Sequence, residues 1–382
     1  MASTLEETVA AFQNDARIEG ARVVVHENGR LVHDLAVGTS DGEPIASDSV
    51  WWVASMTKPI VALATLLLID EGSVALDDPT STFIPEFGTP RRVRVLAAGT
   101  SLQLAPPFDP VDRNSWDYVP ADRDLTVRDF LTMTSGLQTI MVTNTEIPPV
   151  MPGDTLASFV PKLSDAALDF QPGTQWHYSN ATGFEVLARI VEVVSDVPFR
   201  QFVDERIFIP LGMTSTAFGL ADRLRDQALP LGFIAQHPLV GSDFSSGSAG
   251  LFSTAGDYAR FANGLLDSLR GDGPFPQELI AEMSRNQIGA IRLGGVSAAS
   301  YGAIPESTNA GVAYGFGVLD LIDPEAAGID LPAHSFGWDG IGSRRFWVIP
   351  ELNTTIVMFV SGEHADALHR AVESIVRSEA SV

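Results

Sequence analysis

Ser55 and Lys58 are the residues of this chain whose types and spacing best suit nucleophilic chemistry. Lysine is rare here, because only Lys58 and Lys162 among the 24 basic residues are lysines and the others are arginines. A desolvated lysine can lose its proton, whereas arginine effectively cannot. A neutral amine one helical turn from a serine hydroxyl can act as the base that activates the serine. The pair therefore predicts a serine nucleophile with a lysine base.

The residues around this pair predict a buried helix that begins near Ser55. An apolar run over 60–69 is followed by a glycine stop at Gly72. Pro59 is tolerated only in the first turn of a helix, which sets the start of this one. Positions i and i+3 share a helix face, so the Ser55 hydroxyl and the Lys58 amine should converge. The alternative is a capping serine beside a solvated lysine, but an apolar helix offers Lys58 no obvious route to water.

Tyr178 and Asn180 form a second polar group, at a predicted loop-to-helix junction. A Pro172-Gly173 turn precedes them, and Asn180 can cap the helix predicted over 181–195. Taken alone, Tyr178 would be read as a core tyrosine. Taken with Ser55 and Lys58, it is a candidate partner for the base, which must both lose a proton and stay poised near neutrality.

Ser-x-x-Lys, then Tyr-x-Asn, then a glycine-containing strand near the C-terminus, in this order, resembles the serine β-lactamase and penicillin-binding superfamily. Within its class C-like branch, the chain is most similar to family VIII carboxylesterases. The likeness runs over roughly residues 5–375. Besides the motifs, it rests on four segments: 76–79, 125–137, 209–214 and 250–254.

The third motif separates the branches of this superfamily. Its β-lactamases and penicillin-binding proteins carry Lys-Thr-Gly, whose lysine helps to hold the carboxylate of the antibiotic. This chain has no lysine after Lys162, and Trp338-Asp339-Gly340 stands in place of the motif. That sequence resembles the Trp-Gly-Gly of family VIII esterases. The resemblance implies an oxyanion hole made by the backbone N–H groups of Ser55 and Ile341.

Asp339 is the departure from the family VIII motif. On a strand, its side chain should point away from Trp338, toward Arg344 or Arg345. If it faced the pocket instead, it would repel an anionic substrate. The resemblance implies that the substrate is contacted by four residues: Asn180, Trp338, Asp339 and Gly340.

Ser40 lies in a second pattern, Gly-x-Ser-x-Gly over 38–42, which matches the nucleophile elbow of α/β-hydrolases. An elbow requires a strand before it and a helix directly after it. Glu43-Pro44-Ile45 follows, and these residues do not start a helix. Ser40 is therefore predicted to lie in a plain turn.

The order of strand and helix patterns predicts an α/β (α+β) fold of the β-lactamase type. An antiparallel sheet is expected from both termini, flanked by helices, with an inserted, mainly helical domain. We assign residues 1–85 and 305–382 to the α/β domain and 86–304 to the helical domain. Strands are expected on both sides of Asn28-Gly29, a hairpin signal, and at 313–320, 335–338, 345–349 and 354–360. Helices are expected near 126–134, 155–163, 181–195, 199–207, 255–268 and 276–285.

Composition restricts the classes of partner. The formal charge of −24 over 382 residues argues against nucleic acid. The chain has no cysteine, which excludes disulfides, thiolate catalysis and cysteine metal sites. The longest apolar run is too short to cross a bilayer, and the first residues do not resemble a signal peptide. We therefore expect a cytoplasmic protein that needs no metal or organic cofactor, and its oligomeric state is left open.

The predicted activity is that of a serine carboxylesterase. It would cleave small neutral esters with short acyl chains through an acyl-enzyme on Ser55, with Lys58 and Tyr178 sharing the base role and pocket walls from 138–153 and near 235–250. The alternatives are a β-lactamase, an amidase or D-amino-acid peptidase, and an acyltransferase. A non-catalytic binding protein is a further alternative, but it would have no reason to keep the rare lysine.

Overall fold

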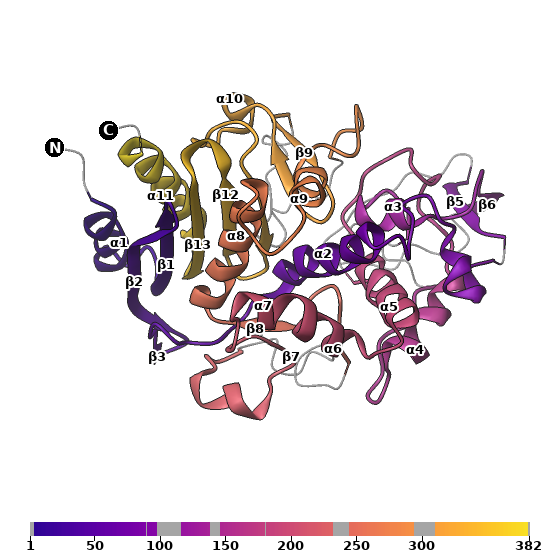
Figure 1. The fold of residues 1–382 in the computed structure, drawn as a ribbon, viewed down its shortest axis with the longest axis horizontal. Coiled ribbons are helices and arrows are strands. Elements are labelled where there is room, and N and C mark those ends of the chain that lie inside the picture. Colours follow the sequence, from indigo (N-terminus) through magenta and orange to yellow (C-terminus); the bar gives the residue numbers. More distant parts are fainter. Residues whose placement is uncertain are drawn as a thin grey trace.

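A computed structural model describes residues 4–88, 90–97, 116–137, 146–179, 181–231, 244–293 and 310–380. Its centre is an eight-stranded antiparallel sheet in the order β3-β2-β1-β13-β12-β11-β10-β9 (Figure 1). The strands are β1 (Gly20–Glu27), β2 (Arg30–Ser40), β3 (Glu43–Pro44), β9 (Val312–Tyr314), β10 (Leu319–Leu321), β11 (Phe336–Gly340), β12 (Arg344–Ile349) and β13 (Thr354–Ser361). Every strand of this sheet comes from one end of the chain or the other. The predicted α/β fold class is confirmed.

Two turns of the sheet depend on residues with positive φ. Asn28 (φ 52°) and Gly29 (φ 73°) join β1 to β2 as the hairpin signal predicts. The single strand predicted over 313–320 is wrong, because the chain turns between β9 and β10. The Gly315 N–H donates to the Val318 carbonyl at 2.8 Å, and Gly317 has φ 74°. A Cβ on Gly317 would lie 2.6 Å from the Ala62 side chain, so glycine allows this turn to reach the neighbouring helix.

Helices cover both faces of the sheet, and the alternation of β12 shows which helix covers which face. The Phe346 ring lies 5.1 Å from the Tyr258 ring of α8 (Ala255–Leu269). The next residue, Trp347, points the other way, and its Nε1–H donates to Glu373 of α11 (Ala365–Glu379) at 2.8 Å. Helix α1 (Leu5–Asn14) lies beside α11 (Figure 1). Helix α8 thus packs on the sheet although 86–304 is predicted as the helical domain, and that division of the chain stays a prediction.

The middle of the chain is mainly helical, with two small sheets that sequence patterns did not predict. The remaining α-helices are α2 (Thr57–Asp70), α3 (Val127–Leu131), α4 (Leu156–Phe159), α5 (Gly183–Ser195), α6 (Phe199–Val203), α7 (Ile209–Leu211), α9 (Gln277–Ser284) and α10 (Pro324–Ala327). One small sheet pairs β4 (Trp51–Trp52), β8 (Leu251–Ser253) and β7 (Ala217–Phe218), and the other pairs β5 (Arg92–Leu96) with β6 (Trp116–Pro120). Strands of two to five residues carry too little alternation to be recognised from sequence.

Shorter helical turns complete the framework. They are 3-10 turns at η1 (Ala54–Met56), η2 (Thr80–Thr82), η3 (Pro85–Gly88), η5 (Val160–Asp165), η7 (Asp222–Gln227) and η11 (Pro350–Leu352), and a π-helical turn at η6 (Asp204–Phe208). Within the described ranges, no helix combines the length and the apolar character needed to span a membrane.

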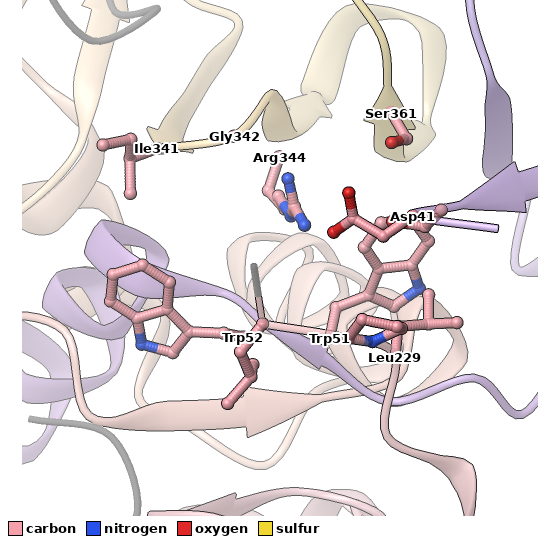
Figure 2. A pocket seen from close by; sticks show the side chains of 11 residues that line it. Asp41, Trp51, Trp52, Leu229, Ile341, Gly342, Arg344 and Ser361 are labelled. Atoms are coloured by element: carbon pink, nitrogen blue, oxygen red, sulfur yellow. The ribbon is translucent and has the colours of Figure 1, made fainter. Parts of the chain in front are cut away.

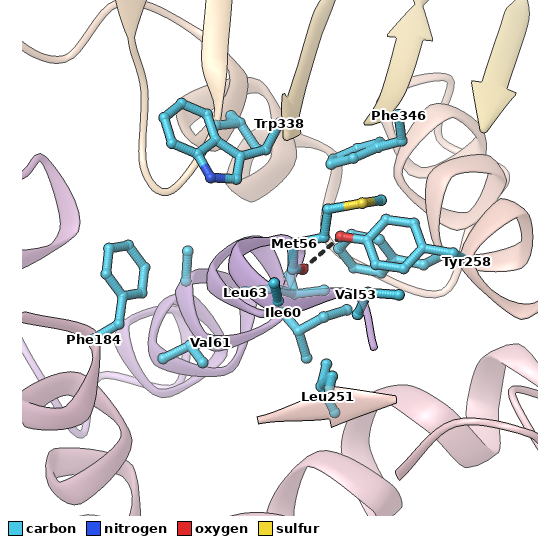
Figure 3. Packing of buried hydrophobic residues seen from close by; sticks show 14 of the residues in the cluster. Val53, Met56, Ile60, Val61, Leu63, Phe184, Leu251, Tyr258, Trp338 and Phe346 are labelled. Carbon is cyan, nitrogen blue, oxygen red and sulfur yellow. Dashed lines mark hydrogen bonds between the residues drawn. The ribbon is translucent and has the colours of Figure 1, made fainter. Parts of the chain in front are cut away.

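Helix α2 runs through the centre of the molecule, between the large sheet and the helices α5 and α6 (Figure 1). Every residue from Thr57 to Leu68 is buried, which explains why this helix is apolar on all sides. Figure 3 shows its N-terminal end packed among side chains from several elements, including Phe184, Leu251 and Tyr258. The Tyr258 hydroxyl donates to the Met56 carbonyl at 2.6 Å, which anchors the start of the helix.

Candidate active site

Ser55 lies in the 3-10 turn η1 that leads into α2, and two side chains converge on its hydroxyl. The Lys58 Nζ is 3.2 Å from Ser55 Oγ, as the spacing predicts. The Tyr178 hydroxyl donates to Ser55 Oγ at 2.5 Å from a position 123 residues away in the chain. Ser55 and Tyr178 are partly buried, whereas Lys58 is fully buried. A reacting carbonyl can therefore reach Ser55 while the lysine is kept from water.

The backbone just before Ser55 adopts an uncommon conformation that its neighbours hold in place. Ala54 has φ 47°, in the left-handed region that residues other than glycine seldom occupy. Its carbonyl accepts a hydrogen bond from the Thr57 hydroxyl at 2.6 Å. The same hydroxyl accepts from the Leu251 N–H at 3.1 Å, and the Trp52 Nε1–H donates to the Ala249 carbonyl at 2.5 Å. These contacts tie the turn that carries Ser55 to the 249–251 segment.

Burial sets the protonation states of the two groups that face Ser55. Desolvation lowers the pKa of Lys58 from 10.5 to about 7, and the nearby negative charge of Glu185 opposes this only in part. Burial raises the pKa of the Tyr178 phenol well above its ordinary value, although the hydrogen bond to Ser55 works against the shift. Near neutral pH, a large fraction of Lys58 is thus a neutral amine and Tyr178 is a phenol. Lys58 is equipped to accept a proton, and Tyr178 is equipped to donate one.

These protonation states predict the pH dependence of hydrolysis. Only neutral Lys58 can accept the Ser55 proton, so kcat/KM for a neutral ester should rise with pH until Lys58 is deprotonated. We expect an acidic limb with an apparent pKa of about 7, falling about tenfold per pH unit below it. The measurement is kcat/KM from about pH 5 to about pH 9. A profile that stays flat across this range would show that Lys58 does not titrate in the rate-determining step.

Glu185 is a buried residue of this site that sequence reasoning missed. Its carboxylate accepts hydrogen bonds from the Ser246 hydroxyl at 2.5 Å and from the Gly247 N–H at 2.7 Å. The Ser248 N–H donates to it as well, at 3.2 Å. The Ser248 carbonyl in turn accepts from Lys58 Nζ at 2.9 Å. The available signal was a carboxylate inside the apolar stretch of helix α5, where an unpaired charge would be costly.

The third motif lies on β11, and its residues face opposite sides of the sheet. The Trp338 ring packs 5.8 Å from the Tyr178 ring, on the catalytic side. Asp339 forms a two-pronged ion pair with Arg345, with distances of 2.8 Å and 2.9 Å. Arg345 also reaches Glu373 of α11 at 3.2 Å. Of the two predicted directions for Asp339, the structure has the one toward Arg345, so this carboxylate does not face Ser55.

The end of β11 passes very close to the segment that precedes Ser55. A Cβ on Gly340 would lie 2.3 Å from the Val53 carbonyl oxygen, so only glycine fits there. Ile341 comes next, in the turn between β11 and β12. This approach is what an oxyanion hole from the Ser55 and Ile341 amides would require, and that role stays a prediction.

Some predicted residues lie outside the described residues or away from the site. Asn180 is outside them, as are 138–145 and 232–243, which hold much of the predicted pocket wall. Ser40 ends β2 and is followed by a turn and the short strand β3, so the elbow geometry is absent there.

Comparisons with known proteins agree with this architecture. The Beta-lactamase family profile matches residues 5–377. Esterase EstB of Burkholderia gladioli is 27% identical over 400 residues, covering 94% of this chain and 90% of EstB. The structure of EstCE1, a hydrolase with promiscuous acyltransferase activity, superposes with a TM-score of 0.74 at 20% identity, covering 97% of both chains. Simvastatin synthase LovD from Aspergillus terreus, in its unliganded form, superposes with a TM-score of 0.74 at 18% identity, covering 98% of this chain and 97% of LovD.

The family match covers nearly the whole chain, and the similar structures share its complete fold at low sequence identity. The protein therefore belongs to the Beta-lactamase family, within the superfamily of serine β-lactamases and penicillin-binding proteins.

Proposed function

We propose that this protein is a serine carboxylesterase of the family VIII type that cleaves small neutral esters with short acyl chains. One observation carries the proposal: Ser55 Oγ is within hydrogen-bond distance of both Lys58 Nζ and the Tyr178 hydroxyl, while Trp338 occupies the third motif. The similarity to esterase EstB over 94% of the chain supports the same class of reaction. Its substrates would be small molecules, since the net charge of −24 disfavours nucleic acid.

The proposed reaction begins with Lys58 as the base. Neutral Lys58 takes the hydroxyl proton of Ser55 as Oγ attacks the ester carbonyl carbon. The negative oxygen of the tetrahedral intermediate would bind the backbone N–H groups of Ser55 and Ile341. Tyr178 then donates its proton to the alcohol oxygen as the carbon–oxygen bond breaks, and the proton on Lys58 replaces the one that Tyr178 gave up. The products of this half-reaction are the free alcohol and an acyl-Ser55 ester.

Water completes the cycle by the same steps in reverse. It loses a proton to the basic groups as its oxygen attacks the acyl carbon, and the bond to Ser55 Oγ breaks as that oxygen regains a proton. The acid leaves and the resting enzyme returns. An alcohol in place of water would give acyl transfer from the same intermediate, an activity named for the structurally similar EstCE1.

The choice between esterase and β-lactamase is tested with paired chromogenic substrates. We expect 4-nitrophenyl butyrate to be turned over far more efficiently than a chromogenic cephalosporin, because no lysine is present in the third motif to hold the lactam carboxylate. A lost charged hydrogen bond of about 1.5–3 kcal/mol corresponds to roughly a 10- to 150-fold deficit in kcat/KM. Similar efficiency on the two substrates would argue for a β-lactamase. Adding an alcohol to the same assay measures acyl transfer by the appearance of the new ester.

A further inference from the structure

A cavity of about 280 Å³ opens beside the turn that joins β11 to β12 (Figure 2). Its walls come from five regions of the chain: the turn after β2, the segment just before Ser55, residues 229–231, the turn from β11 into β12, and the end of β13. They include Asp41, Trp51, Trp52, Ile341, Arg344 and Ser361. Trp338, the first residue of the third motif, is not among the residues that line this cavity.

Among the described residues that line this cavity, Arg344 carries the positive charge. The guanidinium carbon lies 4.7 Å from the centre of the Trp51 ring. Among the residues that the structure describes, the Arg344 side chain forms neither an ion pair nor a hydrogen bond, and its buried Nε has no partner. An arginine side chain carries five N–H donors, and buried donors without partners are costly. The neighbouring Arg345, by contrast, is held by Asp339 and Glu373.

Asp41 lies across the cavity from this guanidinium, and its negative charge raises the pKa of Arg344 against the effect of burial. Figure 2 shows its carboxylate directed toward Arg344, although the two side chains are not among the ion pairs found between the described residues. Asp41 lies in the exposed turn after β2, with φ 49°. Burial lowers the pKa of Arg344 to about 10, so its guanidinium remains charged at neutral pH. The cavity thus offers a charged, unsatisfied donor group to a ligand small enough to lie in front of it.

The cavity is linked to the reacting centre through two of its wall residues. Trp52 is three positions before Ser55, and its indole is hydrogen-bonded to the 249 carbonyl. Ile341 carries one of the two amides predicted to form the oxyanion hole. Because Gly340 lies against Val53, these two wall segments are held together next to Ser55.

We propose that Arg344 forms a subsite that binds a carboxylate carried by the ester substrate. A planar guanidinium suits a carboxylate because it can donate two parallel hydrogen bonds to it. The protein's charge of −24 disfavours free anions in general, which makes a carboxylate attached to an ester bound at Ser55 the better occupant. The proposal rests on the esterase function and extends it: neutral esters remain substrates, and esters with one appropriately placed carboxylate are preferred.

The test compares acidic and neutral esters in two arms. For a carboxylate on the acyl side, 4-nitrophenyl hydrogen adipate is compared with 4-nitrophenyl hexanoate. For one on the alcohol side, 4-acetoxybenzoate is compared with its methyl ester. The quantity measured is the ratio of kcat/KM for the acidic ester to that for the neutral one. In Arg344→Met, we expect this ratio to fall by roughly 10- to 150-fold in one arm, as for the loss of a charged hydrogen bond of about 1.5–3 kcal/mol.

Two further variants should change the same ratio of kcat/KM values in different ways: one should raise it, and the other should lower it only in part. Asp41→Asn removes the competing negative charge and should raise the ratio in the same arm, while asparagine tolerates the positive φ of this turn. Arg344→Lys keeps the charge but not the two-pronged geometry, and its ratio should lie between those of wild type and Arg344→Met. Arg225→Met, at an exposed arginine paired with Asp222, is the matched control and should leave both ratios unchanged.

The outcomes separate this proposal from the esterase proposal. If Arg344→Met, Arg344→Lys and Asp41→Asn all keep the wild-type ratio in both arms, Arg344 only packs on Trp51 and the subsite is refuted. If Arg344→Met does not fold, the ratios measured for Arg344→Lys and Asp41→Asn still decide whether the subsite exists. A wild-type protein that hydrolyses none of the four esters would refute the proposed function instead. The subsite is then tested by binding alone, since adipate at constant ionic strength should raise the Tm of wild type more than that of Arg344→Lys.

Discussion

Replacing Ser55 by alanine is expected to lower kcat/KM for 4-nitrophenyl butyrate by at least about 10⁴-fold. Without Oγ no acyl-enzyme can form, and the amine of Lys58 and the phenol of Tyr178 have no nucleophile to activate. The fold should survive, because Ser55 is partly exposed and its side chain contacts only these two groups among the contacts described. Hydrolysis is measured together with far-UV circular dichroism to confirm that the variant is folded.

A fluorophosphonate probe gives an independent readout of the same prediction. The probe should label wild type on the peptide containing Ser55 and should not label Ser55→Ala. Ser40→Ala should retain labelling, since Ser40 lies where no helix follows to form a nucleophile elbow. Labelling at Ser40, or wild-type hydrolysis by Ser55→Ala, would be incompatible with the proposed mechanism.

Replacing Lys58 by arginine is expected to lower kcat by about 10²–10⁴-fold, the usual contribution of a general base. Arginine keeps the positive charge but cannot supply a neutral amine. The matched control is Lys162→Arg at the chain's other lysine, which is exposed and pairs with Asp154 at 2.9 Å. That variant should keep wild-type kcat. Full activity of Lys58→Arg would mean that the amine is not the base.

The stability of Lys58→Met separates a catalytic lysine from a structural one. Wild-type Lys58 has a pKa of about 7 when folded and 10.5 in its ordinary state, so the unfolded chain binds more protons between these values. The free energy of unfolding of the wild type therefore increases as the pH rises from about 7 to 10.5. Lys58→Met lacks this dependence. It should be inactive and more stable than wild type, on the order of a few kcal/mol below about pH 7, with the difference shrinking toward pH 10.5. A destabilised Lys58→Met at low pH would indicate a structural lysine.

The relation between Ser55 and Lys58 is the part of the site that the sequence determined by itself. Three residues of separation on a helix place two side chains on one face whatever surrounds the helix. The apolar run after Pro59 implied the burial that depresses the pKa of the lysine. The alternation of a strand likewise required Asp339 and Trp338 to point in opposite directions. These are local properties of the chain, and they hold without knowledge of the rest of the fold.

Other parts of the site were decided by contacts between distant segments. That Tyr178 reaches Ser55 depends on how the loop before α5 lies against α2, and the sequence offered Tyr178 only as a candidate partner for the base. Helix α5 also brings Glu185 under the 246–248 turn, whose Ser248 carbonyl then holds Lys58. A buried carboxylate is satisfied by donors from wherever the fold supplies them, so its partners cannot be found by spacing.

The two adjacent arginines of β12 show most clearly which contacts could not be predicted from the sequence. In sequence, Arg344 and Arg345 were equivalent candidates for Asp339. The register of β11 on β12 pairs Asp339 with Arg345, which faces α11, and turns Arg344 to the opposite face, over Trp51. A shift of one residue would exchange them, because neighbouring side chains on a strand face opposite sides. Strand register depends on how the whole sheet packs, so tertiary structure alone decided which arginine is neutralised and which remains open to a ligand.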